Sequence, residues 1–365
     1  MNLLRFLQQR RALIGVTLAL VYLAALTLGW VFWPGAFFRG YWFALMFWTQ
    51  LTVGAWIALL IQHLTGGEWG RVAAPYLRAA ASSFFLLLPL FLPPLLALPH
   101  LFSWTQIRPG ISAVALVNKE PWLNTSAFLL RTVFYLAALA VMISLRRRDI
   151  LASIAGPLLV FTIILFSFYS ADWMMSLEPS FYSSMYPFLY FSGAMVAIFA
   201  LLSGAVAWLQ IRGLAPPNPG LLLDYGTLLF SAVLFWGYIV FSQFIIIWTG
   251  NLPDEAEWYL VRSEPSWLWF TLLVLAGHFA IPFCLLLSRS IKRNPRQLLA
   301  IAAPLLGLHL LEVFWMTRPT PGEGFRISIF DFLMPVLFGV AWLWFILGTR
   351  ESSFSPLPAE AVHET

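Results

Sequence analysis

Apolar residues run along this chain in ten long stretches, separated by short polar or proline-containing segments. Each has about the 20 apolar residues that an α-helix needs to cross the hydrocarbon core of a bilayer. The stretches are continuously apolar and too long for the alternating strands of a membrane barrel. The pattern therefore predicts an all-α polytopic membrane protein with about ten transmembrane helices, near residues 12–33, 41–63, 75–99, 122–145, 150–171, 185–210, 221–249, 265–289, 297–317 and 328–349.

The two ends of the chain are interpreted differently. Residues 1–30 combine a basic start with an apolar stretch that is long enough to span, and no clear small-residue cleavage site follows. We therefore expect a retained first helix rather than a signal peptide. Residues 351–365 read as a short polar tail, so the membrane domain is expected to cover residues 1–350.

Composition and charge support the membrane interpretation and predict an orientation. Hydrophobic residues make up 61% of the chain and charged residues 10%, whereas soluble proteins have about 25% charged residues. If the N-terminus is cytoplasmic, fourteen Lys and Arg residues fall on the cytoplasmic side and six on the other, which predicts that both termini are cytoplasmic. The net charge of +5 is thus a signal of topology and not of nucleic-acid binding. The fourteen are Arg5, Arg10, Arg11, Arg71, Arg78, Arg146, Arg147, Arg148, Arg212, Arg289, Lys292, Arg293, Arg296 and Arg350; the six are Arg39, Arg108, Lys119, Arg262, Arg318 and Arg326.

Cysteine usage limits the cofactors that this chain could bind alone. Cys284 is the single cysteine, so a disulfide framework and a four-thiolate iron–sulfur or zinc site are both excluded. No Cys-x-x-Cys-His sequence for haem attachment occurs. We expect no metal site and no cofactor bound by this chain.

Three ionisable residues in the last third of the chain form the first candidate site. Inserting an ionisable side chain into the middle of a transmembrane helix costs roughly 2.5–3.5 kcal/mol, so the presence of each of these residues requires a structural or functional explanation. His309 and Glu312 are three residues apart and share a helix face, where they could hold and pass a proton. The alternative is that Glu312 makes only a helix–helix hydrogen bond.

His278 is followed four residues later by Pro282, which cannot donate to the carbonyl of His278. The freed carbonyl beside an imidazole would suit a proton stop, or the kink would serve packing only. Ligation of haem b by His278 and His309 is a further hypothesis, although nothing else in the sequence marks a cofactor cleft.

Arg131 and Asp172 form the second candidate site. Arg131 lies within the fourth span and needs an anionic partner, and Asp172 at the end of the fifth span is the nearest candidate. A structural ion pair is one interpretation, and a role in proton exit or quinone contact is the other. Glu178, a few residues beyond, is expected to cap a helix or to face a partner subunit.

Three segments carry a resemblance to a known family: "ADWMMSLEPSFYSSMYPFLYFSGA" (171–194), "WGYIVFSQFIIIWTGNLPDEAEWYLVR" (236–262) and "HFAIPFCLLLSRSIKRNPRQL" (278–298). In content and order they resemble the ActF subunit of bacterial alternative complex III, within the wider family of NrfD-like polysulfide-reductase anchors. The likeness covers most of the second half of the chain, and the first half is matched mainly by helix count.

The resemblance implies a non-catalytic subunit of a quinol oxidoreductase in a bacterial inner-membrane electron transport chain. Helices two to five and six to nine would form two four-helix bundles, with helices one and ten flanking them. Partners would be an NrfD-like quinol-binding subunit, an iron–sulfur protein, c-type cytochromes and in some chains a terminal oxidase, so that quinol, haem c and iron–sulfur centres belong to those subunits. A proton-conducting role has been proposed for such chains.

Two positions depart from the family pattern. Family members tend to have a histidine and a threonine where this chain has Ser180 and Ser184, whereas the acid Asp172 is retained. A mechanism that needs a histidine at this turn is therefore in doubt here.

Three other functions stay open from the sequence: a subunit that itself binds quinone, a secondary transporter, for which proline-broken helices would also serve, and a purely structural anchor.

Overall fold

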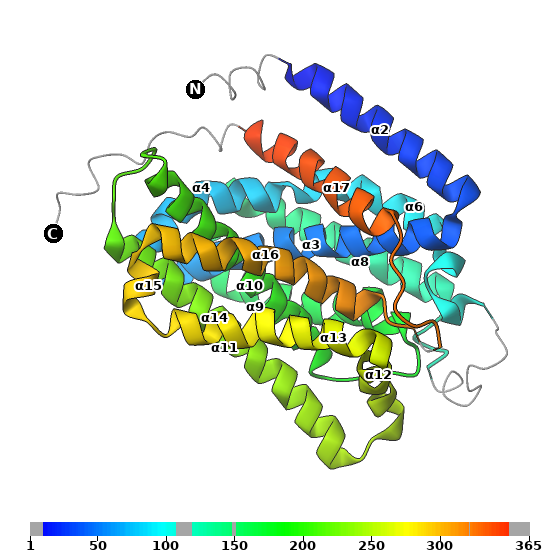
Figure 1. The fold of residues 1–365 in the computed structure, drawn as a ribbon. Helices are drawn as coiled ribbons and strands as arrows, with labels where there is room; N and C mark the ends of the chain where they lie inside the picture. The colour runs from blue at the N-terminus through cyan, green and yellow to red at the C-terminus, as the bar shows by residue number, and fades with distance from the viewer. Residues whose placement is uncertain (1–9, 107–118, 148–150, 321, 350–365) are drawn as a thin grey trace.

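The computed structural model describes residues 10–106, 119–147, 151–320 and 322–349, and within these ranges the chain is helical and has no strand (Figure 1). Ten helical segments in the described part are long and apolar enough to cross a membrane, which confirms an all-α polytopic membrane protein. They are α2 (Arg11–Phe32), α3 (Pro34–Thr65), α4 to α6 (Glu68–Ser82, Phe84–Leu87 and Leu92–Leu96), α8 (Thr125–Ser144), α9 (Leu151–Trp173), α10 (Tyr186–Ile211), α11 (Pro219–Gly250), α13 and α14 (Pro265–Val274 and Ile281–Leu286), α16 (Pro295–Thr317) and α17 (Phe330–Leu347).

Proline placement accounts for the main differences from the predicted bounds. α3 begins at Pro34 and not near residue 41, because proline is favoured in the first helical turn, where its missing N–H is not needed. The third span is not one helix: α5 is followed by the short 3₁₀ helix η1 (Leu88–Phe91) and then by α6. Pro89, Pro93 and Pro94 lie in this stretch and cannot donate the backbone bonds of a regular helix. Between the predicted spans 221–249 and 265–289 the structure has another helix, α12 (Pro253–Ser263).

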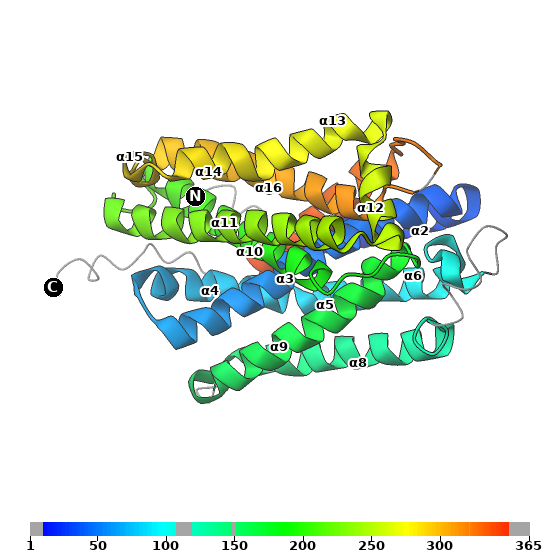
Figure 2. The same ribbon diagram turned by 90° about the horizontal axis from the view of Figure 1, so that it is seen from below.

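α3 and α10 form the interior of the molecule. α3 packs against α4, α9, α10 and α17, and α10 packs along α11 and α16. In Figure 2 α8 and α9 lie on one side of this pair, and α13 and α16 lie on the other. The division into two four-helix bundles stays a prediction, since α3 and α10 also pack against each other.

The first and last spanning helices meet at one end of the molecule. The Arg11 guanidinium donates to the carbonyl of Gly348 at 2.5 Å, and the Trp344 indole donates to the carbonyl of Arg11 at 3.1 Å. The start of α2 and the end of α17 therefore lie on the same side, which we call the terminal side. Which side faces the cytoplasm stays a prediction from the distribution of Lys and Arg.

Candidate functional site

A π-helical turn, η6 (Leu275–Ala280), joins α13 to α14 and carries His278. Pro282 follows at the fourth position and has no N–H to bond to the carbonyl of His278. A wider turn relieves this conflict, and such turns inside α-helices are frequent at functional sites. The sequence predicted a kink here, and the structure has a π turn that places a fully buried His278 against α16.

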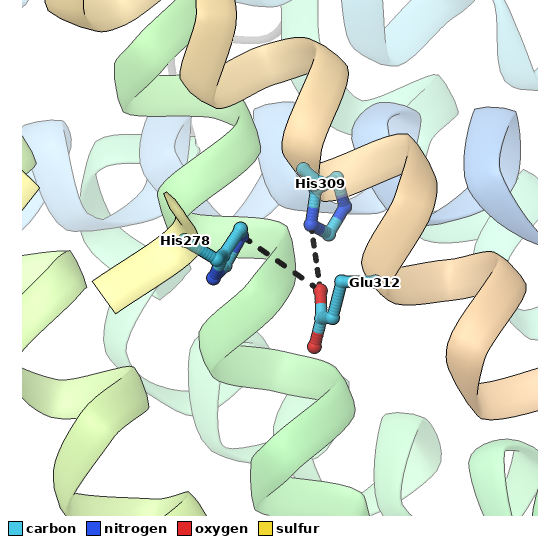
Figure 3. A group of neighbouring side chains, drawn as sticks. All are labelled: His278, His309 and Glu312. Atoms are coloured by element: carbon cyan, nitrogen blue, oxygen red, sulfur yellow. Dashed lines mark ion pairs between the residues drawn. The ribbon is translucent and has the colours of Figure 1, made fainter. Parts of the chain in front are cut away.

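His278, His309 and Glu312 converge in the interior, and we call them the buried triad (Figure 3). The Nδ1 atom of His309 lies 2.8 Å from Oε2 of Glu312, and Nε2 of His278 lies 3.9 Å from the same oxygen. The two imidazole rings are 5.6 Å apart between centroids. All three side chains have no exposed surface in the structure. The pairing of His309 with Glu312 follows from their spacing on one helix, whereas the approach of His278 from η6 is a tertiary contact.

Trp236 on α11 fixes the other carboxylate oxygen of the triad. Its indole Nε1 donates to Oε1 of Glu312 at 2.8 Å, and its ring packs edge-on against His278 with centroids 4.5 Å apart. Oε1 is thus occupied by a neutral donor, and Oε2 faces both histidines. Sequence reasoning missed Trp236, because one tryptophan among eighteen carries no signal of its partner.

Gly193 on α10 allows the interior helix to approach the triad closely. A Cβ atom at this position would lie 2.9 Å from Oε2 of Glu312 and 3.1 Å from both Nε2 of Gln50 and Cε1 of His309. Any larger residue would push these groups apart. Gln50 on α3 donates to the backbone carbonyl of Tyr190 at 2.5 Å, so α3, α10, α11, η6 and α16 all contribute to the environment of the triad.

Several polar atoms of the triad have no hydrogen-bond partner within the described part of the protein. They are both ring nitrogens of His278, both ring nitrogens of His309 and Oε2 of Glu312. The 2.8 Å contact between His309 and Glu312 is thus an ion pair by distance and is not aligned as a hydrogen bond. Buried polar atoms without a partner are rare, and each requires an explanation such as strain, a catalytic role or a bound water or ion. Imidazole nitrogens and carboxylate oxygens both bind protons, so the triad has the atoms needed to take up or release a proton inside the helical interior.

The triad also bears on cofactor binding. The two imidazoles and the carboxylate offer donor atoms within 4.8 Å of one another, and such donors can bind divalent transition metals. The closest two of these atoms, however, lie 2.8 Å apart in direct contact, as in an ion pair between an imidazole and a carboxylate. The haem b hypothesis fits poorly, because the Glu312 carboxylate approaches both rings in the space that a porphyrin between them would need.

Arg131 and Asp172 form an ion pair, which confirms the predicted partner. Nε of Arg131 donates to Oδ2 of Asp172 at 2.7 Å, and a second guanidinium nitrogen donates to Oδ1 at 3.0 Å. Trp122 donates to Oδ1 and Tyr135 to Oδ2, each at 2.8 Å. Each oxygen of this buried carboxylate therefore receives two donors. The pair joins α8 to α9, and these two helices lie on the other side of α3 and α10 from α13 and α16 in Figure 2.

Glu178, expected to cap a helix or to face a partner, follows the short 3₁₀ helix Met175–Leu177 as its C-cap residue and pairs with Arg262 of α12 at 3.0 Å. Whether it faces a partner stays a prediction. Burial raises the pKa of the Glu178 carboxyl above its usual range, although the Arg262 guanidinium beside it acts in the opposite direction. Arg262 itself lies 3.7 Å above the ring of Trp258 and donates to that residue's carbonyl at 2.8 Å. Ser180, in place of the family histidine, makes a long 3.4 Å contact with Glu257 of α12.

No protein-family model matches this chain, and no curated protein is significantly similar to it in sequence. The likeness to the alternative complex III subunit therefore stays an expectation from the sequence.

Proposed function

We propose that this chain is a non-redox membrane subunit of a bacterial quinol oxidoreductase of the alternative complex III type, and that its buried triad transfers protons. The likeness of three sequence segments supports the first part. The second part, proton transfer, rests on the observation that His278 and His309 both approach the same carboxylate oxygen, Oε2 of Glu312. In this proposal electrons pass through partner subunits that hold haem c and iron–sulfur centres.

The chemistry of the triad suits a group that holds one proton and exchanges it. A lone carboxylate in this apolar interior would be costly, and a positive charge on His309, 2.8 Å away, offsets part of that cost. The 3.9 Å gap to His278 is longer than a hydrogen bond, so a small side-chain movement would be needed to pass the proton on. His278 lies on a different helix from its two partners, and transfer would therefore move the proton from one helix to its neighbour.

Purification in mild detergent with a tag on this chain tests the first part. We expect c-type haem to co-elute, visible in a reduced-minus-oxidised spectrum. A single polypeptide without haem would overturn assignment to the complex and favour a transporter, which would show substrate uptake in liposomes by the chain alone. Protection of a photoreactive quinone label on this chain by excess quinol would favour a quinone-binding subunit.

The second part is tested by the Glu312→Gln variant of the whole complex in liposomes with a pH-sensitive dye. We expect fewer protons transferred per electron, with haem content and quinol oxidation in detergent retained. His63→Gln is the matched control, since His63 at the end of α3 bonds to the backbone carbonyl of Leu59, away from the triad. Unchanged proton transfer in Glu312→Gln would leave only a structural anchor.

A further inference from the structure

A crevice separates α2 from the rest of the molecule along part of its length. It has a volume of about 310 Å³ and lies between α2, α17 and the segment formed by α5 and η1. In Figure 1 α2 runs along the edge of the molecule beside α17. Ala19 and Pro89, which both line the crevice, are exposed, so the crevice is open to its surroundings and is not an enclosed cavity. In a membrane, those surroundings are lipid.

Side-chain size explains why the crevice exists. Near the far end of α2, Gly29 packs so tightly on Phe37 that a Cβ atom would clash. At the terminal side, Gly15 packs on Trp344, where a Cβ atom would lie 2.8 Å from the indole. Between these contacts Ala19 of α2 and Ala341 of α17 line the space and are too short to fill it. Small residues usually let two membrane helices touch, whereas these two leave room between the helices.

The walls of the crevice suit a hydrocarbon chain better than a polar ring. Among its lining residues, the polar side-chain groups are the Trp344 indole N–H, which donates to the carbonyl of Arg11, and the Tyr22 hydroxyl, which lies 2.9 Å from the hydroxyl of Tyr41. Tyr41 donates its proton to the carbonyl of Leu90 at 2.8 Å, so Tyr22 must donate to Tyr41. Both hydroxyl protons are thus used within the protein. A quinone carbonyl placed here would find no donor, whereas an acyl chain needs none.

The position of the crevice matches one leaflet of a bilayer. The lining of α2 runs from Gly15 to Tyr22, which is about 10 Å along a helix axis. This is roughly a third of the ~30 Å hydrocarbon core, and it begins near the terminal side. The volume is at the lower end of the about 300–1,000 Å³ found for small-molecule sites. One lipid chain from the leaflet on the terminal side would therefore extend into the crevice without crossing the bilayer centre.

A positive charge lies next to Trp344, one of the residues that line the crevice. Arg11 is one helical turn from Gly15, and its guanidinium lies 5.3 Å from the ring centroid of Trp344, which lines the crevice. One nitrogen donates to the carbonyl of Gly348, and a guanidinium has further N–H donors that match phosphate oxygens. Basic residues at a membrane surface attract anionic lipids. We propose that the crevice binds one acyl chain of an anionic phospholipid whose phosphate contacts Arg11.

This proposal is independent of the proposed function, because the crevice shares no residue with the buried triad. Its first test measures phospholipid retained by the purified protein after extensive detergent washing, by mass spectrometry of extracted lipid. We expect about one anionic phospholipid per chain in the wild type and at least a five-fold decrease in Ala19→Trp, which fills the crevice. Leu20→Trp is the matched control, since Leu20 is 62% exposed on the same helix and does not line the crevice.

Ala341→Leu fills the crevice from the opposite wall with a smaller side chain, and it guards against a folding defect in Ala19→Trp. Its retained lipid should fall as well, with a far-UV circular dichroism spectrum like that of the wild type. Equal retention in the filled variants and in Leu20→Trp would overturn the proposal. So would recovery of an isoprenoid quinone, rather than a phospholipid, as the molecule that the filled variants lose.

The contribution of the headgroup is tested by Arg11→Gln. Phosphatidylglycerol added to delipidated wild type should raise Tm more than phosphatidylcholine with the same chains does. We expect this preference to vanish in Arg11→Gln and both effects to vanish in Ala19→Trp. Equal effects of the two lipids on the wild type would refute the role of the phosphate.

Discussion

Replacing Asp172 with Asn tests how strongly its charge holds α8 to α9. Each carboxylate oxygen accepts two hydrogen bonds, at 2.7 and 2.8 Å on Oδ2 and at 3.0 and 2.8 Å on Oδ1. In Asn, one oxygen becomes an NH₂ group that faces two donors, so two bonds are lost whichever way the amide is turned. At about 1.5–3 kcal/mol for each bond to a charged group, the sum is about 3–6 kcal/mol. The Arg131 side chain is 18% exposed and recovers some hydration, so we expect about 3–5 kcal/mol, the range for breaking a buried ion pair.

The assay is unfolding by sodium dodecyl sulfate in mixed micelles, followed by tryptophan fluorescence and extrapolated to zero denaturant. Asp224→Asn is the matched control, because Asp224 is exposed on α11 and the same chemical change there should alter the unfolding free energy by no more than about 0.5 kcal/mol. Removing both charges, with Arg131→Met and Asp172→Leu together, should cost less than the sum of the single changes by about 1–3 kcal/mol. A loss below 1 kcal/mol in Asp172→Asn, or strict additivity in the pair, would refute this reasoning.

Three further predictions concern single side chains. Burial raises the pKa of Glu178 above its ordinary value of 4.5. The stability that this shift contributes is therefore fully present below pH 4.5 and is lost as the pH rises through the pKa of the folded state. Glu178→Gln should flatten the fall of Tm with rising pH, and an unchanged slope would contradict this. Gly193→Ala should lower the unfolding free energy by about 1–3 kcal/mol and impair proton transfer, because the added Cβ would press on Glu312. Gly307→Ala is the control: the space around Gly307 is open, so both the unfolding free energy and proton transfer should stay unchanged. Trp236→Phe should lower the unfolding free energy by about 1.5–3 kcal/mol through loss of its bond to Glu312, and a change within 0.5 kcal/mol would show that this bond is not important.

The candidate site could be predicted only in part. His309 and Glu312 were placed together from their spacing, and Asp172 was assigned to Arg131 because a buried charge needs a partner in an adjacent span. In contrast, Glu178 pairs with Arg262, a residue 84 positions away on α12. Sequence spacing says nothing about such a contact, because α12 lies between two predicted spans, in a segment for which the hydropathy pattern predicts no helix.

The sequence by itself determined the helical class and the number of spans, because continuous apolar stretches of bilayer length permit no other structure that satisfies the backbone in lipid. It also determined which ionisable groups must be explained. The tertiary structure alone decided that His278 on η6 meets Glu312 on α16, that Trp236 holds the other carboxylate oxygen, and that Gly193 lets α10 approach them. The physical reason is that hydropathy determines which segments can span the membrane. Which helices become neighbours, and how each is rotated about its own axis, depends on side-chain packing between segments far apart in the chain.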